Sequence, residues 1–251
     1  MLDLNGRIAV ITGGASGIGA ACAAALEREG VRVARWDMAD GPGVIGCDVA
    51  DAAAVANAID RTVARYGPPT LLVAAAGVAD GHWIVDMEPA AWDRVLGVNL
   101  RGVMLSVQAV ARTAIAAGSN GSMVLISSVN GVVADPGLSA YSASKAAVYH
   151  FARVAARELG PHGIRINAVG PGPTETPMLR GALDLPGYRE EILRRTPLGE
   201  VGTPERIAEA VTGLMKMEWV TGQALMVDGG ASLTTGRGVW KTPAQDDGNG
   251  T

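Results

Sequence analysis

The sequence is poor in the residues that build disulfide frameworks and metal sites. Its 251 residues include two cysteines, Cys22 and Cys47, and three histidines, His82, His150 and His162. The cysteines lack C-x-x-C spacing, so they indicate neither a disulfide framework nor a zinc site, and we expect buried thiols in a reducing cytosol. The histidines share no spacing and have no acidic companions typical of a metal site, so we expect no bound metal.

Charge and hydropathy argue against two further classes of protein. The formal net charge is −4, and Lys and Arg are scattered along the chain rather than clustered, which disfavours a nucleic-acid partner. No apolar stretch approaches the roughly 20 residues that span a bilayer. Residues 1–5 lack the positive flank and the apolar run of a signal peptide. We therefore expect a cytoplasmic protein with no nucleic-acid or membrane partner.

The chain is instead rich in apolar residues and in glycine. Hydrophobic residues make up 48% of the sequence and glycine occupies 34 positions, which suits a compact fold with many tight turns. The length allows one α/β domain with a substantial core, so we expect a single domain over 1–251. Residues 241–251 are polar and glycine-rich and are expected to form a flexible tail.

Apolar strands alternate with helices along most of the sequence. This alternation predicts a Rossmann-type α/β fold, a doubly wound parallel sheet of about seven strands with helices on both faces. Ligands bind such a sheet at the carboxyl ends of its strands. The expected strands cover 7–12, 31–36, 44–47, 71–74, 122–127, 165–169 and 224–227, and the expected helices cover 17–29, 52–66, 90–117, 139–159 and a stretch that starts at Thr203 and Pro204.

The segment before the last expected helix has a different composition. Residues 173–200 are rich in proline and glycine and read as a mobile excursion above the sheet, which we expect to form a substrate lid. Within it, 178–185 is apolar at helical spacing. This stretch either moves as a lid over the expected ligand site or packs permanently on the domain, and the sequence leaves both open.

A glycine-rich turn connects the first expected strand to the first helix. Residues 12–19 read T-G-G-A-S-G-I-G, where glycines let the backbone approach a pyrophosphate and the helix N-terminus attracts its charge. The spacing departs from G-x-G-x-x-G, so an ordinary turn is the alternative. We expect a dinucleotide to contact Gly13, Ser16, Gly17, Ile18 and Gly19.

Asp37 ends the second expected strand, about 20 residues past the glycine turn, where a carboxylate can accept hydrogen bonds from the adenosine ribose. The same charge repels a ribose 2′-phosphate, and Gly14, Ala15 and Ser16 carry no cation to bind one. The expected cofactor is therefore NAD. Arg35 could restore NADP binding if it reached the ribose, but its place inside the strand favours another direction. A solvated turn residue is the alternative role of Asp37.

Tyr141 and Lys145 lie four residues apart at the start of an expected helix, so their side chains share one face. A phenol has a pKa of about 10, and a neighbouring ammonium favours phenolate. Tyr141 can therefore serve as base for alcohol oxidation or as acid for carbonyl reduction. Ser128, at the end of the fifth strand, can hydrogen-bond the same substrate oxygen. Strand alternation sends the adjacent Ser127, the alternative serine, to the opposite face.

These motifs, in this order, resemble the short-chain dehydrogenase/reductase family over nearly the whole chain. The resemblance rests on the glycine turn, the serine, and Y-S-A-S-K at 141–145, followed by P-G at 171–172. Further matches are C-D-V at 47–49, V-N-L at 98–100, R-I-N-A-V at 165–169 and V-D-G-G at 227–230.

The resemblance implies a catalytic tetrad of Asn99, Ser128, Tyr141 and Lys145, with Ser128 chosen over Ser127. Asn99 would hold a water that links Lys145 to solvent, and Lys145 would also bind the nicotinamide ribose. Hydride would then move between NAD(H) and the carbon of a secondary alcohol or ketone, with Tyr141 as general acid/base. The main alternative is a catalytically silent NAD-binding regulatory protein on the same fold, and an epimerase or dehydratase on a related fold is a weaker one.

The resemblance also implies cofactor contacts beyond the glycine turn. Asp48 and Val49 would flank the adenine, and Thr176 would reach the nicotinamide amide. Thr174 stands where the family usually has an aliphatic residue, so its backbone is the expected contact. The other expected contacts are Ala75, Ala76, Gly77, Tyr141, Lys145, Pro171 and Gly172.

Three features depart from the family pattern. Ala74 and Ala75 stand where the family commonly has two asparagines, so local hydrogen bonding must differ. Too few residues separate Asp37 from Asp48 for the usual helix, and 39–43 is expected to be a bare turn. The short connection over 215–220 puts the usual packing before the last strand in doubt.

Family helices equivalent to 90–117 and 139–159 usually pair with copies of themselves, which implies a homotetramer. Substrate choice is expected to depend on His82 and Trp83, on 130–138 and on 176–195, and the substrate stays open. Small residues that would allow helices to approach are Ala109, Ala111, Ala114, Ala143, Ala146 and Ala147.

Overall fold

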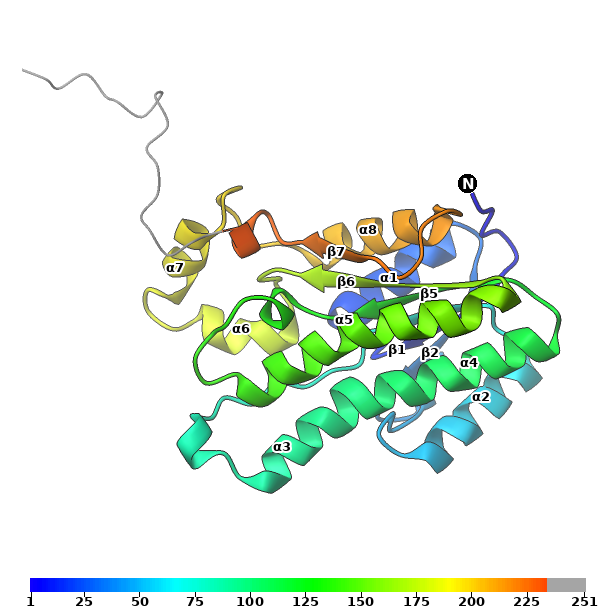
Figure 1. Cartoon of the computed structure of the whole chain (residues 1–251), viewed down its shortest axis with the longest axis horizontal. Helices are drawn as coiled ribbons and strands as arrows, with labels where there is room; N and C mark the ends of the chain where they lie inside the picture. Colours follow the sequence, from blue (N-terminus) through cyan, green and yellow to red (C-terminus); the bar gives the residue numbers. More distant parts are fainter. Residues whose placement is uncertain (234–251) are drawn as a thin grey trace, which may run out of the picture.

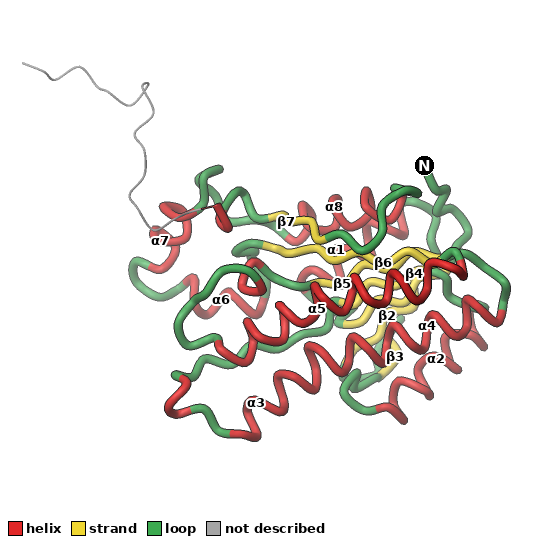
Figure 2. The backbone as a smooth tube through the Cα atoms, viewed as in Figure 1, coloured by secondary structure: helices red, strands yellow, loops and turns green. Residues whose placement is uncertain are grey.

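The computed structural model describes residues 1–233, so the expected tail over 241–251 lies outside the described residues. It contains one sheet of seven parallel strands in the order β3-β2-β1-β4-β5-β6-β7, with helices on both faces (Figure 1; Figure 2). The expected doubly wound Rossmann-type sheet is confirmed. Over 1–233, no helix has the length and apolar character needed to cross a membrane. The strands are β1 (Ile8–Thr12), β2 (Arg32–Asp37), β3 (Val44–Gly46), β4 (Leu71–Ala74), β5 (Gly121–Ile126), β6 (Ile164–Pro171) and β7 (Ala224–Val227), and the helices are α1 (Gly17–Arg28), α2 (Ala52–Tyr66), α3 (Pro89–Leu96), α4 (Gly102–Ala116), α5 (Ser139–Leu159), α6 (Pro177–Leu183), α7 (Tyr188–Arg195) and α8 (Pro204–Lys216).

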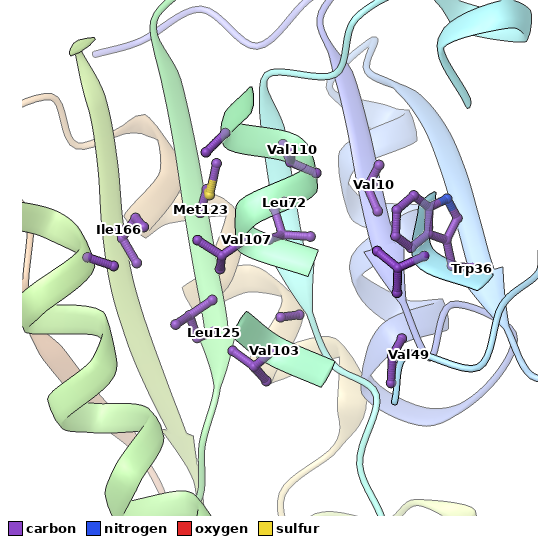
Figure 3. Packing of buried hydrophobic residues seen from close by; sticks show 14 of the residues in the cluster. Val10, Trp36, Val49, Leu72, Val103, Val107, Val110, Met123, Leu125 and Ile166 are labelled. Carbon is purple, nitrogen blue, oxygen red and sulfur yellow. The ribbon is translucent and has the colours of Figure 1, made fainter. Parts of the chain in front are cut away.

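Alternating strand residues enter two separate cores because helices cover both faces of the sheet. In β1, Val10 packs with residues of α2, α4 and α5, whereas Ala9 and Ile11 pack with residues of α1 and α8. Figure 3 shows the first core, where Val10, Trp36 and Val49 lie together at one end of the cluster. Burial on both faces explains why the strands read as continuous apolar runs in the sequence.

The strand order reverses at β1. From β1 the chain runs outward through β2 to β3 and then returns to β4 on the other side, so β1 pairs with both β2 and β4. Doubly wound sheets bind ligands at such a switch point, beyond the carboxyl ends of the strands. The glycine turn after β1 and the residues that follow β2 and β4 therefore meet at one edge.

The expected helix over 90–117 is present, with one internal irregularity that the sequence did not predict. Between α3 and α4 the chain makes one π-helical turn at Gly97–Arg101. This turn carries the buried Asn99, whose side-chain amide bonds both the N–H and the carbonyl of Val78 after β4. A π-helical turn holds about one residue more than an α-helical turn but does not end the helix, so the sequence pattern merges the three segments.

The connection from β2 to β3 is a tight turn with no helix in the described chain, which confirms the expectation for 39–43. The backbones of Gly41 and Val44 pair with each other across the turn. Asp40 accepts a hydrogen bond from Gly46 and pairs with Arg61 on α2, with Nη2 and Oδ1 2.7 Å apart. These contacts anchor the turn where a helix would otherwise pack.

The short connection between α8 and β7 is held by side chains of β6. The Arg165 guanidinium donates hydrogen bonds to the carbonyls of Met215 and Val220. Asn167 donates to the Val220 carbonyl and accepts from the backbone N–H of Gln223. Two polar residues of β6 therefore fix the path of this connection into the edge strand.

Residues 173–200 contain α6 and α7, which lie beyond one end of the sheet (Figure 1). The two helices share a small cluster of buried residues, Leu183, Ile192 and Val201, against which Leu179 and Leu193 pack. This cluster is separate from the two cores of the sheet. The apolar spacing over 178–185 is thus used in packing α6 against its neighbours, and its motion as a lid stays a prediction.

Candidate active site

A cavity of about 750 Å³ lies at the carboxyl edge of the sheet and brings together nearly all of the predicted site residues. The exception is Asn99, which is fully buried behind the cavity wall. The predicted residues that line the cavity are Gly13, Ser16, Gly17, Ile18, Gly19, Asp37, Asp48, Val49, Ala75, Ala76, Gly77, Ser128, Tyr141, Lys145, Pro171, Gly172, Thr174 and Thr176.

The glycine turn presents bare backbone to this cavity. Gly13 has a positive φ of 65°, and a Cβ on it would lie 3.0 Å from the backbone of Ala76 after β4. A Cβ on Gly19 would collide with the carbonyl oxygen of Gly13. Ser16, the N-cap of α1, makes no side-chain hydrogen bond to the helix among the described contacts. The first backbone N–H groups of α1 are therefore available to an anionic ligand.

Asp37 is fixed at the edge of this turn. Its Oδ2 accepts a hydrogen bond from the N–H of Ala15, and its Oδ1 accepts one from Met38, each at 2.9 Å. Arg35 points away from the cavity to Glu27 on α1, as expected from its place in the strand. The carboxylate that was predicted to bind the ribose thus lies in the cavity wall without a cation beside it among the lining residues described.

The predicted adenine contacts follow β3. Asp48 accepts a hydrogen bond from the N–H of Ala50 and lines the cavity with Val49. Met38 and Cys47 also line it, and we had not predicted either one. Burial raises the pKa of the Cys47 thiol to about 11, so the thiol stays neutral and adds an apolar surface to the cavity wall. Its position directly before Asp48 is the signal that could have identified it.

Tyr141 and Lys145 project from the first turns of α5 into the same cavity. The Lys145 Nζ donates a hydrogen bond to the carbonyl of Ile126 at 2.9 Å and lies 5.6 Å from the centre of the Tyr141 ring. Burial lowers the pKa of Lys145 to about 8. Burial also raises the pKa of Tyr141, and the neighbouring Ser128 hydroxyl acts in the opposite direction. Burial therefore determines the direction of the Tyr141 pKa, opposite to the effect expected of a neighbouring ammonium.

The two candidate serines have different hydrogen-bond partners. Ser127 donates to the carbonyl of Lys145 at 2.6 Å, so its hydroxyl fastens β5 to α5. Ser128 accepts from the backbone N–H of Asn130 and donates to its Oδ1 at 3.3 Å. The Ser128 hydroxyl thus contacts Asn130 and faces Tyr141, whereas the Ser127 hydroxyl is engaged by the backbone of α5. These contacts favour the predicted choice of Ser128.

Asn99 connects the π-helical turn to the residues behind the cavity. Its Nδ2 donates to the Val78 carbonyl and to the Ser144 hydroxyl at 2.9 and 3.1 Å. A Cβ on Gly77 would lie 3.4 Å from Asn99 Oδ1 and 3.5 Å from Lys145 Nζ, so the glycine is situated between the two side chains. Among the described contacts, Asn99 bonds Val78 and Ser144 whereas Lys145 bonds the Ile126 carbonyl.

The residues after β6 close the cavity above the glycine turn. A Cβ on Gly172 would lie 2.7 Å from the backbone of Asp228, so the chain is tightly packed there. The Thr174 hydroxyl donates to the carbonyl of Gly172, and Thr174 lines the cavity; contact through its backbone stays a prediction. Thr176 precedes α6 and lies against Gly17, where a Cβ would be 3.4 Å from its methyl group.

The part of the cavity beyond Tyr141 is built from loops and from the two outer helices. Asn130 donates to Asp135 Oδ2 at 2.8 Å, and Arg195 at the end of α7 donates to Asp135 Oδ1 at 3.2 Å. This chain of contacts connects Ser128 to α7. Leu138, Ala182 and Tyr188 also line the cavity and belong to 130–138 and 176–195, the segments expected to affect substrate choice. Lining residues that the sequence did not single out are Val78, Ala79, Asp80, Gly81 and Val98.

His82 and Trp83 were expected to border the substrate, but neither is among the residues that line the cavity. The His82 Nδ1 lies 3.1 Å from Asp80, and Trp83 is 64% exposed. The preceding residues 78–81 line the cavity instead, and Asp80 among them also pairs with Arg94. Over the described residues, no cluster of His, Cys, Asp or Glu could hold a metal ion.

Comparison with known proteins matches the chain as a whole to a defined family. A family model described as enoyl-(acyl carrier protein) reductase matches residues 13–232. A (3R)-3-hydroxyacyl-CoA dehydrogenase of Canis lupus familiaris is 35% identical over 91% of this chain and 97% of its own length. A cis-4-hydroxycyclohexanecarboxylate dehydrogenase of Sinomonas cyclohexanicum is 39% identical over 89% of this chain and 96% of its own.

Solved structures agree with the sequence comparisons. A short-chain type dehydrogenase/reductase from Mycobacterium marinum superposes with a TM-score of 0.88 at 30% identity, covering 92% of this chain and 98% of the other. A 3-ketoacyl-(acyl-carrier-protein) reductase from Brucella melitensis, in complex with NADH, gives a TM-score of 0.83 at 29% identity over 91% of this chain and 99% of the other.

Proposed function

Because this chain belongs to the short-chain dehydrogenase/reductase family, whose members are oxidoreductases acting on hydroxyl and keto groups, we propose that it uses NAD(H) to interconvert a secondary alcohol and a ketone. The observation that carries the proposal is the convergence of Ser128, Tyr141 and Lys145 on the cavity that the glycine turn lines. A dinucleotide and a reacting carbon can meet there beside a proton donor.

The cavity fits a nicotinamide dinucleotide. Positions where a side chain would collide with neighbouring backbone, such as Gly13 and Gly19, provide the cradle for a pyrophosphate at the N-terminus of α1. Asp37 would bind the adenosine ribose, and its charge favours NAD over NADP. Asp48, Val49, Ala75, Ala76 and Gly77 would border the adenosine half, and Pro171, Gly172, Thr174 and Thr176 the nicotinamide half. The bound cofactor would accept hydride during oxidation and donate it during reduction.

Tyr141 would move the proton. In the oxidation direction its Oη would take the proton of the substrate hydroxyl, and in reduction it would protonate the carbonyl oxygen. Lys145 would favour the phenolate by its charge and hold the nicotinamide ribose. Ser128 would turn its hydroxyl from Asn130 to the substrate oxygen and stabilise its developing charge. Asn99 would act at a distance, by keeping Val78 and the region behind Lys145 in place.

The test is absorbance at the reduced-nicotinamide band when the purified protein receives NAD or NADP with a panel of secondary alcohols. The panel includes 3-hydroxyacyl thioesters and hydroxycyclohexanecarboxylates, which the names of the relatives indicate. Turnover with NAD should fall about 10²- to 10⁴-fold in Tyr141→Phe, while NAD binding by calorimetry is retained. The control is Tyr66→Phe, which removes the same hydroxyl from α2, outside the cavity.

Two results would contradict the proposal. Equal turnover in Tyr141→Phe and wild type would remove the tyrosine from the chemistry. Tight NAD binding with no turnover across a broad panel would instead favour a silent NAD-binding regulatory protein.

We also propose a cytoplasmic homotetramer in which α4 and α5 contribute to the contacts between copies. Both cysteines are buried and free, which suits a reducing compartment. Ala143 and Ala146 on α5 are exposed and can meet another helix, whereas Ala111 and Ala114 on α4 are buried in the core of their own subunit. Sedimentation of a species four times the mass of the chain would support the tetramer, and a monomer would contradict it.

A further inference from the structure

A second charged side chain borders the glycine turn, but it is turned away from the cavity. The Arg35 Nη2 on β2 lies 2.9 Å from both carboxylate oxygens of Glu27 on α1. We propose that Glu27 is a cofactor-specificity residue, which withholds Arg35 from the 2′-phosphate of NADP and adds to the preference for NAD that Asp37 sets. This inference rests on the proposed binding of a nicotinamide dinucleotide in the cavity.

The stem of Arg35 is close enough to the predicted ribose site for its direction to matter. A Cβ on Gly14 would lie 2.9 Å from Arg35 Cβ, so the stem lies directly against the turn. Asp37 follows two residues later, on the same side of the strand, and accepts a hydrogen bond from Ala15. Arg35 and Asp37 therefore flank successive residues of the turn, and the guanidinium can extend along α1 or toward the ribose.

Near the predicted ribose site, the described lining residues include no other cation that could bind a 2′-phosphate. Among the described residues that line the cavity, the one Lys or Arg is Lys145, which lies beside Tyr141. Asp37 and Asp48 line the adenosine end and would repel a phosphate. A guanidinium binds phosphate through two parallel hydrogen bonds. Arg35 is thus the side chain whose release would change the affinity for NADP.

The pair between Arg35 and Glu27 can be broken without disturbing the core. The two side chains are 31% and 44% exposed, and partly exposed ion pairs contribute little to folding stability. Alanine is also the strongest helix former, so Glu27→Ala should leave α1 intact. Removing Glu27 therefore frees the guanidinium rather than unfolding the site.

The experiment measures dissociation constants of NAD⁺ and NADP⁺ by calorimetry in two backgrounds, wild type and Asp37→Ser. In Asp37→Ser, adding Glu27→Ala should tighten NADP⁺ about tenfold, while NAD⁺ changes less than about twofold, because the gain is a charge-assisted contact to the phosphate alone. Adding Arg35→Met should abolish the gain. Raising the salt concentration should reduce it, because salt screens charges on partly exposed groups.

Glu29→Ala is the matched control. Glu29 follows α1 two residues after Glu27 and pairs instead with Lys216, with 2.6 Å between the charged atoms. Its removal changes the net charge equally, so an equal NADP⁺ gain in Glu29→Ala would overturn the proposal. No NADP⁺ gain on adding Glu27→Ala to Asp37→Ser would also overturn it, yet leave the proposed function standing if wild type binds NAD⁺. If wild type binds neither cofactor, the proposed function fails and this inference falls with it.

Discussion

The cavity has two halves that are built in different ways. The half next to the glycine turn is lined by strand ends and bare backbone. Residues such as Gly13 and Ala76 pack so closely there that a Cβ on Gly13 would lie 3.0 Å from the Ala76 backbone. The half beyond Tyr141 is walled by loops and by α6 and α7, where Met178 is 52% exposed and ion pairs such as Asp135 with Arg195 hold the segments together. Close backbone packing fixes the residue type at a position, whereas a loop wall accepts many residue types.

The largest expected effect tests the difference in packing by adding one methyl group in each half. Gly19→Ala in α1 should destabilise the fold by several kcal/mol, because its Cβ meets the carbonyl of Gly13 and the backbone must shift. Gly181→Ala in α6 has nothing within 4 Å of the new Cβ and should be neutral or stabilise by up to about 1 kcal/mol. Chemical denaturation measures both. If Gly19→Ala is tolerated as well as Gly181→Ala, the two halves do not differ in packing.

The next effect concerns Lys145, which lies where the halves meet. Its pKa in the folded protein is about 8, against an ordinary value of 10.5. Between these pH values the unfolded chain still holds the lysine proton and the folded chain has lost it, so folding stability rises with pH. Relative to Lys145→Met, the free energy of unfolding of the wild type should therefore rise by about 3 kcal/mol from pH 8 to pH 10.5.

Denaturation curves of both proteins at several pH values measure this difference, because the other titrating groups are shared. A difference that is flat with pH would mean that Lys145 has the same pKa in the folded and the unfolded protein. A difference that falls with pH would mean that its charged form is stabilised in the folded protein.

The sequence predicted the first half better than the second for a physical reason. The glycine turn, Asp37 and the Tyr141 and Lys145 pair each follow from local backbone needs or from helical spacing, and the structure brings them to one cavity. The sequence indicated 130–138 and 176–195 for substrate choice, but not that Asn130 and Arg195, 65 residues apart, both bond Asp135. No local pattern records such a meeting.

Two other features could not be predicted from the sequence, because they depend on the direction in which side chains of a helix face. The π-helical turn at Gly97–Arg101 does not end the helix, and Asn99 within it bonds the chain after β4, a contact that no local pattern predicts. Ala111 and Ala114 look like surface alanines suited to pairing between copies, yet they face their own core. Small residues fit either role, so their type does not decide their direction.

Removing one carboxylate from each half tests whether cofactor binding and substrate binding are affected independently. Asp37→Ala should weaken NAD⁺ binding about tenfold and narrow the preference over NADP⁺, because the predicted ribose hydrogen bonds and the repulsion of a phosphate are both lost. Asp135→Ala should leave NAD⁺ binding unchanged and raise the KM of the substrate found in the panel, since Asn130 then loses its partner. Calorimetry and steady-state kinetics on both variants give the comparison. Equal losses of NAD⁺ affinity would show that the halves are not independent.

The smallest effect tests whether α7 contributes to the substrate half through one ion pair. Arg195 and Asp135 are 41% and 33% exposed, and exposed pairs contribute about 0–1 kcal/mol, so Arg195→Met should raise the substrate KM by a factor of about two to five with little change in kcat. Arg194→Met is the control, because that neighbour pairs with Glu191 inside α7. A similar rise in both variants would assign the effect to the stability of α7. A rise confined to Arg195→Met, with NAD⁺ affinity unchanged, would show that a partly exposed ion pair helps to shape the substrate half.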